Sequence, residues 1–280
     1  MTLVASRHPQ WPIVALMLVA ALITGVILAA LPRAAAGAGN FSWPDGKKAA
    51  ISLTFDDARP SQLAEGVPLF AELGTHVTFY LTASNIAERG PAWRQAASLG
   101  HELANHSTSH PCSGNFEWSR KNALEEYTLD RMRADLLEAN RAIEAATGIK
   151  PTTFAYPCGQ TFVGRGANVT SYVPLVSELF VAGRGWQGET ANDPEFVDLA
   201  QVMGYPMDDV EFDELAPAIE MAIESGRWLV LAGHDIGTAA GPQVTRVSML
   251  RNLLAELRRP ERGVWVATVA QVATHLKKQR

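Results

Sequence analysis

Short strand-like runs alternate with longer helical runs along the sequence beyond about Asn40, and this alternation leaves few folds open. The strand-like runs read AAISLTF, HVTFYLT, HELANHS, TTFAYP, LFVAG, RWLVLAGHD and VWVATV. The clearest helical pattern, over residues 129–148, carries an apolar stripe of Leu129, Met132, Leu136 and Ile143. RWLVLAGHD has no apolar–polar alternation, which is typical of a strand buried on both faces. The sequence therefore predicts an α/β domain with a mainly parallel sheet, and the number of strands allows a barrel.

The N-terminal residues differ in kind from the rest. An uncharged apolar run covers residues 11–32, and the small residues of RAAAGAGN follow it. Such a segment directs export and is either cut after about Ala36 or Ala38 or retained; the length of the run favours an anchor. We therefore expect a signal peptide or transmembrane helix over residues 1–38 and one domain over residues 39–280. The protein would be membrane-anchored, periplasmic or extracellular.

Composition and charge narrow the class of protein. Of the 280 residues, 47% are hydrophobic and 19% are charged, which suits a folded domain with a sizeable core. The formal net charge is −5, and no run of Lys or Arg follows the N-terminal segment. These features argue against a nucleic-acid partner.

Polar and reactive residues follow four of the predicted strands at the point where each strand ends. They are Asp56 and Asp57, His106 and His110, Pro157 and Cys158, and His234 and Asp235. A turn explains any one pair, but adjacent carboxylates repel each other and lose hydration unless a cation or a chemical task holds them there. Because the carboxyl ends of parallel strands gather at one edge of a sheet, we expect the four groups to share a site.

The segment HSTSH places His106 and His110 four residues apart. This spacing lets two imidazoles converge on one ion in a helical turn, although surface histidines explain it equally well when it stands alone. With an aspartate from a neighbouring strand end, it becomes a set of two histidines and one carboxylate that leaves positions open for water and substrate. One acid of the Asp56–Asp57 pair can then bind metal while the other handles protons.

Taken together, in this order and spacing, TFDD, HSTSH, FAYPCG and LVLAGHD resemble the polysaccharide deacetylase superfamily. Its NodB-homology fold is also called carbohydrate esterase family four. The resemblance covers about residues 48–275, and TFDD with HSTSH is its specific part. It implies a distorted (β/α) barrel, here preceded by an N-terminal hydrophobic helix, and one catalytic divalent ion that is most commonly zinc.

The resemblance also implies a role for each matched residue. Asp57, His106 and His110 bind the metal. Asp56 is the general base that takes a proton from metal-activated water, and His234 is the general acid that protonates the leaving amine or alcohol. Apart from the resemblance, His234 also fits a hydrogen-bonded histidine at a strand end.

The third motif and one tryptophan supply the expected substrate-binding or oxyanion residues. They are Tyr156, Pro157, Cys158, Gly159 and Trp186. The metal and backbone N–H groups near residues 157–159 would hold the tetrahedral oxyanion. Trp186 fits a sugar-stacking wall beside the site or, about equally, a buried core position.

The sequence departs from the family pattern at one position. Many members carry an arginine in the third motif that orients the catalytic aspartate, whereas Ala155 stands at the matching place here. This difference bears on the tuning of Asp56 and not on the metal site. Our hypothesis is that Arg184 or Arg165 reaches Asp56 from another loop.

Two cysteines flank the expected site. Cys112 lies two residues after His110, and Cys158 lies in the third motif. We therefore predict a disulfide that ties the loop after HSTSH to the pocket wall. Two separate thiols, or one thiol acting as a fourth soft ligand, are the alternatives.

The sequence thus predicts an exported, metal-dependent hydrolase that removes acetyl groups from a carbohydrate, with the acetylated carbohydrate as its partner. An uncleaved N-terminal segment would add contact with the membrane. Hydrolysis of a non-peptide C–N bond in a small amide is a second possibility, and a catalytically silent carbohydrate-binding relative is a third. The choice among peptidoglycan, chitin-like oligomers, xylan and exopolysaccharide depends on the loops over residues 111–128 and 159–176.

Overall fold

The structure of the protein, a computed structural model, describes residues 41–280. The predicted signal peptide or hydrophobic helix over residues 1–38 lies outside the described residues. Among the residues that are described, no helix is both long and apolar enough to cross a membrane.

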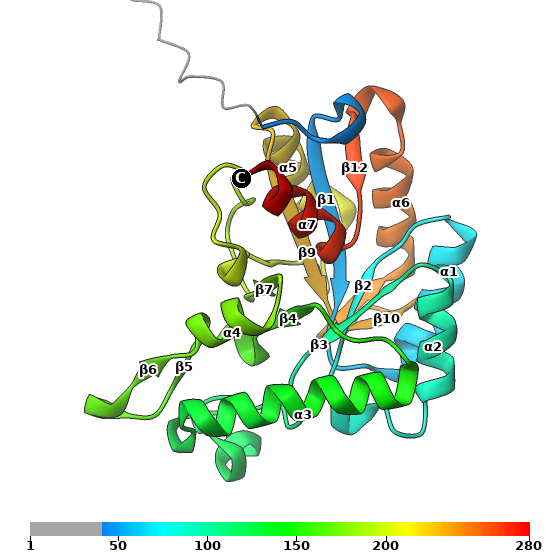
Figure 1. Ribbon diagram of the computed structural model, residues 1–280. Coiled ribbons are helices and arrows are strands. Elements are labelled where there is room, and N and C mark those ends of the chain that lie inside the picture. Colours follow the sequence, from blue (N-terminus) through cyan, green and yellow to red (C-terminus); the bar gives the residue numbers. More distant parts are fainter. Residues whose placement is uncertain (1–40) are drawn as a thin grey trace, which may run out of the picture. The chain divides into compact units, whose positions relative to one another are not determined.

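A parallel sheet runs through the centre of the described residues (Figure 1). Its main path follows the order β7 (Ala182–Arg184), β4 (Thr153–Ala155), β3 (Glu102–Asn105), β2 (Thr78–Leu81), β1 (Ala49–Phe55), β9 (Trp228–Gly233) and β8 (Tyr205–Pro206). A further strand, β12 (Val264–Val266), pairs with the start of β1, whose end pairs with β2. Every pair in this sheet is parallel.

The chain between Val202 and Met207 is hydrogen-bonded to β7 at its start and to β9 at its end. The N–H of Val202 donates to Gly183 O, and the N–H of Gly185 donates to Val202 O, each at 2.8 Å. At the other end of the segment, the N–H of Met207 donates to Ala232 O of β9 at 2.9 Å. The predicted α/β class is therefore confirmed, and the sheet curls into a parallel half-barrel.

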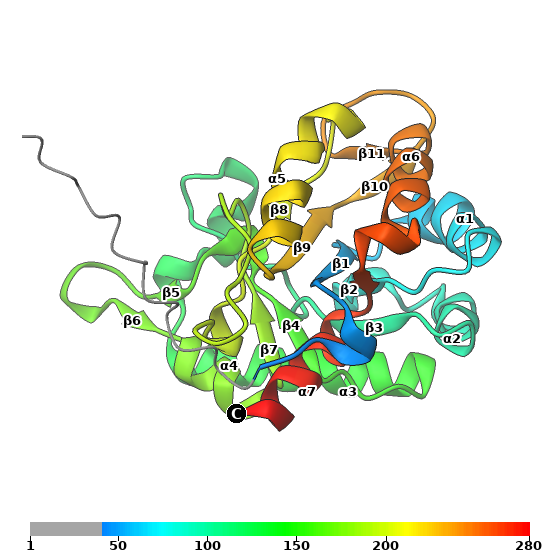
Figure 2. The same cartoon turned by 90° about the horizontal axis from the view of Figure 1, so that it is seen from above.

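Helices lie around the outside of this sheet (Figure 2). They are α1 (Val67–Glu72), α2 (Gly90–Ser98), α3 (Leu129–Thr147), α4 (Val173–Leu179), α5 (Phe212–Glu224), α6 (Val247–Leu257) and α7 (Val269–Gln279). Two small strand pairs, β5 (Phe162–Val163) with β6 (Thr170–Ser171) and β10 (Asp235–Gly237) with β11 (Val244–Arg246), lie apart from the main sheet. The largest apolar core fills the space between β1, β2 and β9 and helices α1, α2, α5 and α6. All six residues of β9 are buried, as its uninterrupted apolar sequence predicts.

Helix α3 shows how the sequence sets the bounds of an element. The Thr128 side chain caps its N-terminus by accepting the N–H of Arg131, and Gly148 ends it with a φ of 77°. Three residues of the predicted stripe are fully buried: Met132, Leu136 and Ile143. The fourth, Leu129, is 39% exposed because it is the first residue of the helix, where the core no longer covers it.

Candidate metal and catalytic site

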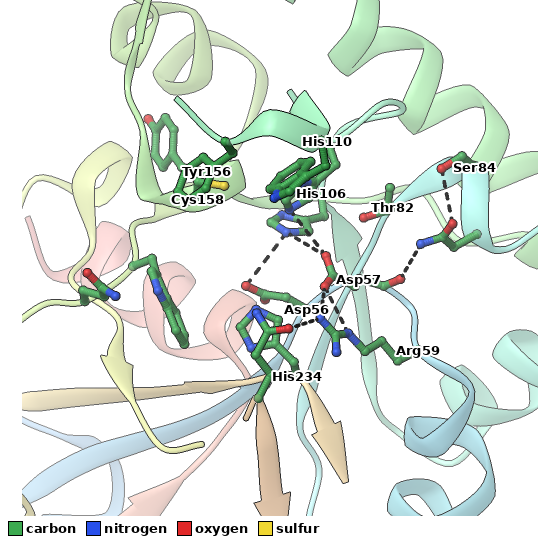
Figure 3. Close-up of a pocket in the computed structure, with 16 residues that line it drawn as sticks. Asp56, Asp57, Arg59, Thr82, Ser84, His106, His110, Tyr156, Cys158 and His234 are labelled. Atoms are coloured by element: carbon green, nitrogen blue, oxygen red, sulfur yellow. Dashed lines mark hydrogen bonds and ion pairs between the residues drawn. The ribbon is translucent and has the colours of Figure 1, made fainter. Parts of the chain in front are cut away.

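Four strand ends deliver their polar residues to one cavity, as a parallel sheet predicts (Figure 3). The cavity lies at the carboxyl ends of β1, β3, β4 and β9 and has a volume of about 800 Å³. Most of the predicted site residues line it: Asp56, Asp57, His106, His110, Tyr156, Cys158, Trp186 and His234. Pro157 and Gly159 belong to the same segment as Tyr156 but do not line this cavity.

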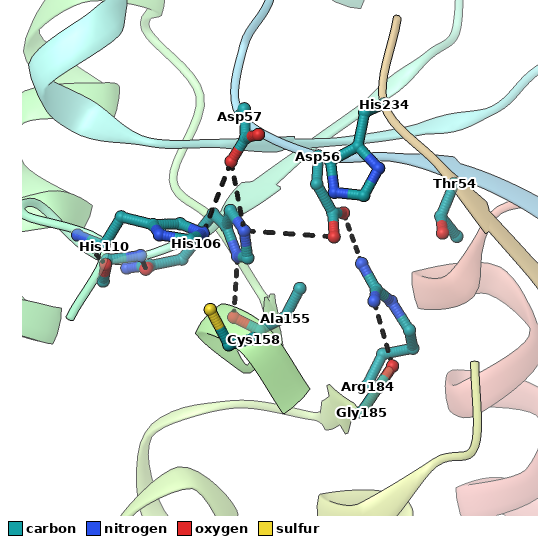
Figure 4. A network of polar contacts seen from close by, with 12 residues as sticks. Thr54, Asp56, Asp57, His106, His110, Ala155, Cys158, Arg184, Gly185 and His234 are labelled. Carbon is teal, nitrogen blue, oxygen red and sulfur yellow. Dashed lines mark hydrogen bonds and ion pairs between the residues drawn. The ribbon is translucent and has the colours of Figure 1, made fainter. Parts of the chain in front are cut away.

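Asp57, His106 and His110 turn their ligand atoms toward one another (Figure 4). Oδ1 of Asp57 lies 3.5 Å from Nε2 of His106 and 3.4 Å from Nε2 of His110. The Nδ1 of His106 lies 2.9 Å from the carbonyl oxygen of Ala155, so it carries the proton and leaves the Nε2 lone pair free. The three ligand atoms lie within 4.8 Å of one another, which fits a single divalent cation.

Protonation states in this set suit metal binding. Burial alone would raise the pKa of Asp57, but the neighbouring imidazoles of His106 and His110 lower it to about 2. The pKa of His110 is lowered to about 4, because burial disfavours the charged ring and His106 adds repulsion. At neutral pH the set therefore offers a carboxylate and an uncharged His110 imidazole, the forms that bind metal.

Left-handed backbone angles occur at two of these ligands, Asp57 and His110, and at residues next to the set. Four non-glycine residues adopt left-handed backbone angles here, with φ of 78° at Asp57, 55° at Ala58, 64° at Ser107 and 48° at His110. Such angles disfavour side chains other than glycine and cluster at functional sites, where surrounding contacts hold them in place. One of these contacts is the N–H of His110, which donates to Oγ of Ser107 at 2.9 Å.

Arg59 orients the carboxylate of Asp57, a role that the sequence analysis missed. Its Nε and Nη2 donate to Oδ2 of Asp57 at 3.1 and 2.9 Å, and its Nη1 donates to Asp235 at 2.6 Å. Because Oδ2 is engaged in this way, Oδ1 is the oxygen that faces the two histidines. The signal for this role was available, since Arg59 follows Asp57 by two residues in an otherwise neutral stretch.

Arg184 forms a buried ion pair with Asp56. Its Nη2 donates to Oδ1 of Asp56, and its Nη1 donates to Gly185 O at 2.9 Å (Figure 4). Arg184 is 0% exposed and Asp56 is 4% exposed. Burial would raise the pKa of Asp56, but the guanidinium of Arg184, with smaller contributions from two histidines, holds this pKa below its usual range. Asp56 is therefore kept ionised.

Ala155 carries no charge, and the register of the sheet explains how Arg184 reaches Asp56 instead. Ala155 of β4 is the register partner of Arg184 on the neighbouring strand β7. An arginine on β7 therefore reaches the carboxyl end of β1 from one strand farther along the sheet. Arg165, the other candidate, lies on the surface and pairs with Glu126.

His234 is held by Asp208, a second residue that the sequence analysis missed. Nδ1 of His234 lies 2.6 Å from Oδ2 of Asp208, and the N–H of His234 donates to Oδ1 at 3.1 Å. The hydroxyl of Thr245 donates to the same Oδ1 at 2.6 Å. Burial lowers the pKa of His234, but the hydrogen bond that it donates to Asp208 and the charges of nearby carboxylates raise it overall. Nδ1 faces Asp208, so Nε2 is the nitrogen left for chemistry in the cavity.

The candidate metal ligands lie in a part of the sequence that matches a protein family. Residues 44–171 match the family model described as polysaccharide deacetylase. The chain carries a polysaccharide deacetylase family domain. The matched range includes Asp56 and the three candidate metal ligands, whereas Arg184, Asp208 and His234 lie beyond it.

Among curated proteins, the chitooligosaccharide deacetylase of Sinorhizobium fredii is 30% identical to this polysaccharide deacetylase domain over 120 residues. The aligned part is 42% of this chain and 46% of that protein. Across the four curated relatives that match, the chain spans between 5% and 46% of the relative's length.

Solved structures share the fold of the polysaccharide deacetylase domain. A Mycobacterium smegmatis protein named as a candidate polysaccharide deacetylase has a TM-score of 0.61 at 19% identity, over 85% of this chain and 93% of that one. A family 4 acetyl xylan esterase from Clostridium thermocellum, in complex with a cobalt ion, has a TM-score of 0.52 at 18% identity, over 82% and 96%. A Bacillus anthracis protein described as a family pseudoenzyme has a TM-score of 0.50 at 20% identity, over 81% and 66%. The shared fold therefore does not by itself establish catalysis.

Asp208→Asn is expected to lower the pKa of His234 and to move the alkaline limb of the pH–rate profile of the polysaccharide deacetylase domain to lower pH. If His234 is the general acid, turnover at neutral pH should fall roughly 10- to 100-fold, because less of His234 carries the proton that this role needs. The raised pKa means that the Asp208–His234 pair stabilises the fold below the ordinary histidine pKa near 6.5, and that this contribution is lost as pH rises through the folded value.

The measurement is kcat against pH, with urea unfolding at acidic and alkaline pH beside it. Asp209→Asn is the matched control, because Asp209 is the adjacent acid and is exposed. Superimposable alkaline limbs for Asp208→Asn and the unchanged protein would show that Asp208 does not set the pKa of the group that limits turnover.

The predicted oxyanion segment of the polysaccharide deacetylase domain has fewer free donors than expected. The N–H of Tyr156 donates to Arg184 O at 2.9 Å, and the N–H of Gly159 donates to Tyr156 O at 2.8 Å. Pro157 has no N–H. Among the described residues no partner is found for the N–H of Cys158. Cys158 is therefore the candidate backbone donor in this segment.

Trp186 forms part of the cavity wall and is half-buried. Its ring stands edge-on to His234, with centroids 5.0 Å apart and an interplanar angle of 78°. Gly159 makes this placement possible: its φ is 67°, and a Cβ there would lie 2.9 Å from Cβ of Trp186. The half-buried ring at the cavity fits a wall position better than a core position.

Cys112 and Cys158 form a disulfide in the structure, so neither sulfur is a free ligand. The bridge joins the loop after His110 to the short helix η6 (Pro157–Gly159). Its sequence separation of 46 residues corresponds, in the chain-entropy account, to about 4 kcal/mol of stabilisation. Sγ of Cys112 lies 3.7 Å from Nδ1 of His110, so the bridge reaches the ring of a candidate metal ligand.

Proposed function

We propose that the protein is a metal-dependent deacetylase that hydrolyses the bond between an acetyl group and a carbohydrate outside the cytoplasm. The observation that carries the proposal is a pair of opposite charge states in one cavity. Arg184 keeps Asp56 ionised, while Asp208 favours the protonated form of His234. Neighbouring groups whose pKa values are pushed in different directions are suited to act as base and acid.

The metal would be held by Asp57, His106 and His110 through one carboxylate oxygen and two Nε2 atoms. Two imidazoles and a carboxylate are a ligand set that zinc accepts, and this set leaves room for substrate. When bound, a divalent cation supplies Lewis-acid chemistry, polarising the acyl carbonyl and making water easier to deprotonate. The residues of this chain do the remaining work.

Asp56 accepts a proton from the water molecule that attacks the acetyl carbon. As the carbonyl oxygen gains negative charge, the N–H of Cys158 donates a hydrogen bond to it. His234 then gives its proton to the leaving nitrogen or oxygen as the bond from that atom to the acetyl carbon breaks, and Asp208 stabilises the charged ring before that transfer. The products are acetate and a free amine or hydroxyl.

A catalytically silent carbohydrate-binding role is supported by one feature only, the absence of an arginine at position 155. Arg184 makes the ion pair to Asp56 that such an arginine would make. The silent role therefore has less support than catalysis. Hydrolysis of a small non-sugar amide uses the same residues, so the substrate panel below must include one.

Export is part of the same proposal. The uncharged apolar run over residues 11–32 supports it, because such a run directs a chain to a membrane. The disulfide between Cys112 and Cys158 supports it independently, because disulfides persist in oxidising compartments. Retention of the apolar run would tether the domain to the membrane.

Acetate release from a panel of acetylated compounds tests the proposal. We expect the zinc-loaded protein to release acetate from at least one N- or O-acetylated oligosaccharide. We expect a chelator to remove roughly 90% or more of the rate, because it takes away the ion that would polarise the carbonyl and activate water. The panel contains chitin oligomers, peptidoglycan fragments, acetylated xylan and a simple N-alkylacetamide. Release from the acetamide alone would identify a small-amide hydrolase, and metal binding without any release would identify a silent relative.

A further inference from the structure

Two large aromatic side chains are exposed at the rim of the catalytic cavity. Trp118 is 64% exposed and Phe116 is 44% exposed, although both are residue types that folding usually buries. Both line the same cavity as Asp57 and His110. The mechanism above uses neither of them, and neither belongs to the motifs that the sequence analysis singled out.

The two rings are stacked on each other next to a candidate metal ligand. Their centroids are 5.5 Å apart with an interplanar angle of 27°, so they are stacked rather than crossed. Trp118 lies 6.0 Å from the His110 ring, at an angle of 37°. Trp118 is therefore a direct neighbour of His110, one of the residues that would hold the metal beside the acetyl carbonyl.

The backbone under these rings is fixed before any ligand arrives. Oγ of Ser119 donates to Cys112 O at 2.8 Å and accepts the N–H of Cys112 at 3.0 Å. Glu125 accepts the hydroxyl of Ser113 at 2.6 Å and the N–H of Gly114 at 2.9 Å. Together with the disulfide, these bonds hold the loop at both ends. A surface that is rigid in advance loses less entropy when it binds.

We propose that Phe116 and Trp118 form a carbohydrate subsite, at which a sugar ring adjoining the acetylated one stacks on the face of Trp118. The C–H groups on one face of a pyranose are apolar and slightly positive, and they complement the negative face of an aromatic ring. This inference rests on the proposed function and makes its substrate an oligosaccharide or polysaccharide rather than a single acetylated sugar or a small amide. Trp186 and Gln187 line the same cavity.

The test compares substrates that share one acetyl group but differ in length. For the full-length, zinc-loaded protein, kcat/KM should rise from an acetylated monosaccharide to a tetrasaccharide of the same sugar. Trp118→Ala should lose about tenfold in kcat/KM on the tetrasaccharide, mainly through a higher KM, and should be unchanged on the monosaccharide. Trp118→Phe keeps a flat ring and should retain most of the length effect.

The matched control is Phe196→Ala, since Phe196 is 90% exposed and lies outside the cavity. Metal content and circular dichroism should be the same in all variants. Equal KM values for the tetrasaccharide in Trp118→Ala and the unchanged protein would overturn the subsite while leaving the deacetylase intact.

A binding measurement separates the subsite from the proposed function. Calorimetry with a deacetylated tetrasaccharide should show binding to the unchanged protein that weakens about tenfold in Trp118→Ala. If no substrate in the panel releases acetate, the proposed function fails, and this binding comparison alone decides the subsite. The absence of binding, or equal binding to both proteins, would overturn it.

Discussion

Replacing Arg184 by methionine is expected to destabilise the fold by about 3–5 kcal/mol and to reduce turnover roughly 100-fold or more. The methionine side chain keeps much of the buried packing of the arginine stem but leaves the carboxylate of Asp56 buried without a cation. A buried charge that loses its arginine partner either stays ionised at high cost or takes up a proton. In the second case Asp56 no longer serves as a base at neutral pH.

Urea unfolding and the pH–rate profile measure the two effects of Arg184→Met. Because the pKa of Asp56 is lowered in the folded protein, the stability that this pair contributes is present above the ordinary pKa near 3.8 and is lost as pH falls through the lowered value. The stability difference between the two proteins should therefore shrink in acid. The acid limb of the rate profile should move to higher pH in the variant.

Arg165→Ala is the control for this experiment, because Arg165 is also an arginine in the second half of the domain but has a side chain that is 67% exposed. It should leave both turnover and stability within the range of a surface substitution. If Arg184→Met were as active and as stable as Arg165→Ala, the ion pair with Asp56 would have no part in catalysis or folding.

Changing Asp56 and Asp57 one at a time to asparagine should have different effects on metal binding and on turnover. Asp57→Asn is expected to lower zinc affinity by at least about 100-fold and to abolish turnover, because it removes a ligand and leaves the charge of Arg59 facing the metal site. Asp56→Asn should keep a full equivalent of metal and lose roughly 100- to 10,000-fold in turnover.

Metal content after dialysis, measured by mass spectrometry, and acetate release on the best substrate of the panel give the two readouts. The variants control for each other, since each removes one negative charge from neighbouring positions in the same cavity. Retention of a full equivalent of tightly bound zinc by Asp57→Asn would remove Asp57 from the ligand set. Normal turnover by Asp56→Asn would remove Asp56 from the role of base.

The sequence alone was sufficient to predict the site residues that directly follow regular strands. Asp56, His106 and His234 each follow a strand directly, and parallel strands bring their carboxyl ends to one edge whatever the loops do. Short, largely apolar runs predicted these strands, so the meeting of the three residues followed from the sequence pattern alone. The same reasoning placed Cys112 and Cys158 at one wall, where the structure joins them.

The residues that tune the site were harder to predict: the sequence left Arg184 and Arg165 both open as the partner of Asp56, and the structure confirms Arg184. Arg184 and Asp56 are 128 residues apart, and their contact depends on β7 lying beside β4, which no local pattern encodes. Asp208 follows β8, a strand of two residues that is too short to show any period. Its position is fixed by the backbone hydrogen bonds that hold the chain between β7 and β9.

The sequence did not predict the exposed aromatic pair Phe116 and Trp118, because both residues lie in an irregular loop. Residues 111–128 contain only short 3₁₀ turns, and their path is set by individual hydrogen bonds rather than by a repeating pattern. A sequence reader sees Phe116 and Trp118 as two aromatic residues in a polar loop. Only the tertiary structure shows that both rings face the cavity.

The bond between Cys112 and Cys158 also has a practical meaning for anyone who produces this protein. It fixes the loop that carries His110 against η6 before a metal ion arrives, so the ligands meet the ion already in place. Protein made where thiols stay reduced would contain the same ligands on a loop that has lost one of its restraints. Two preparations of identical sequence and identical zinc supply would then differ in metal content according to the redox history of the host cell.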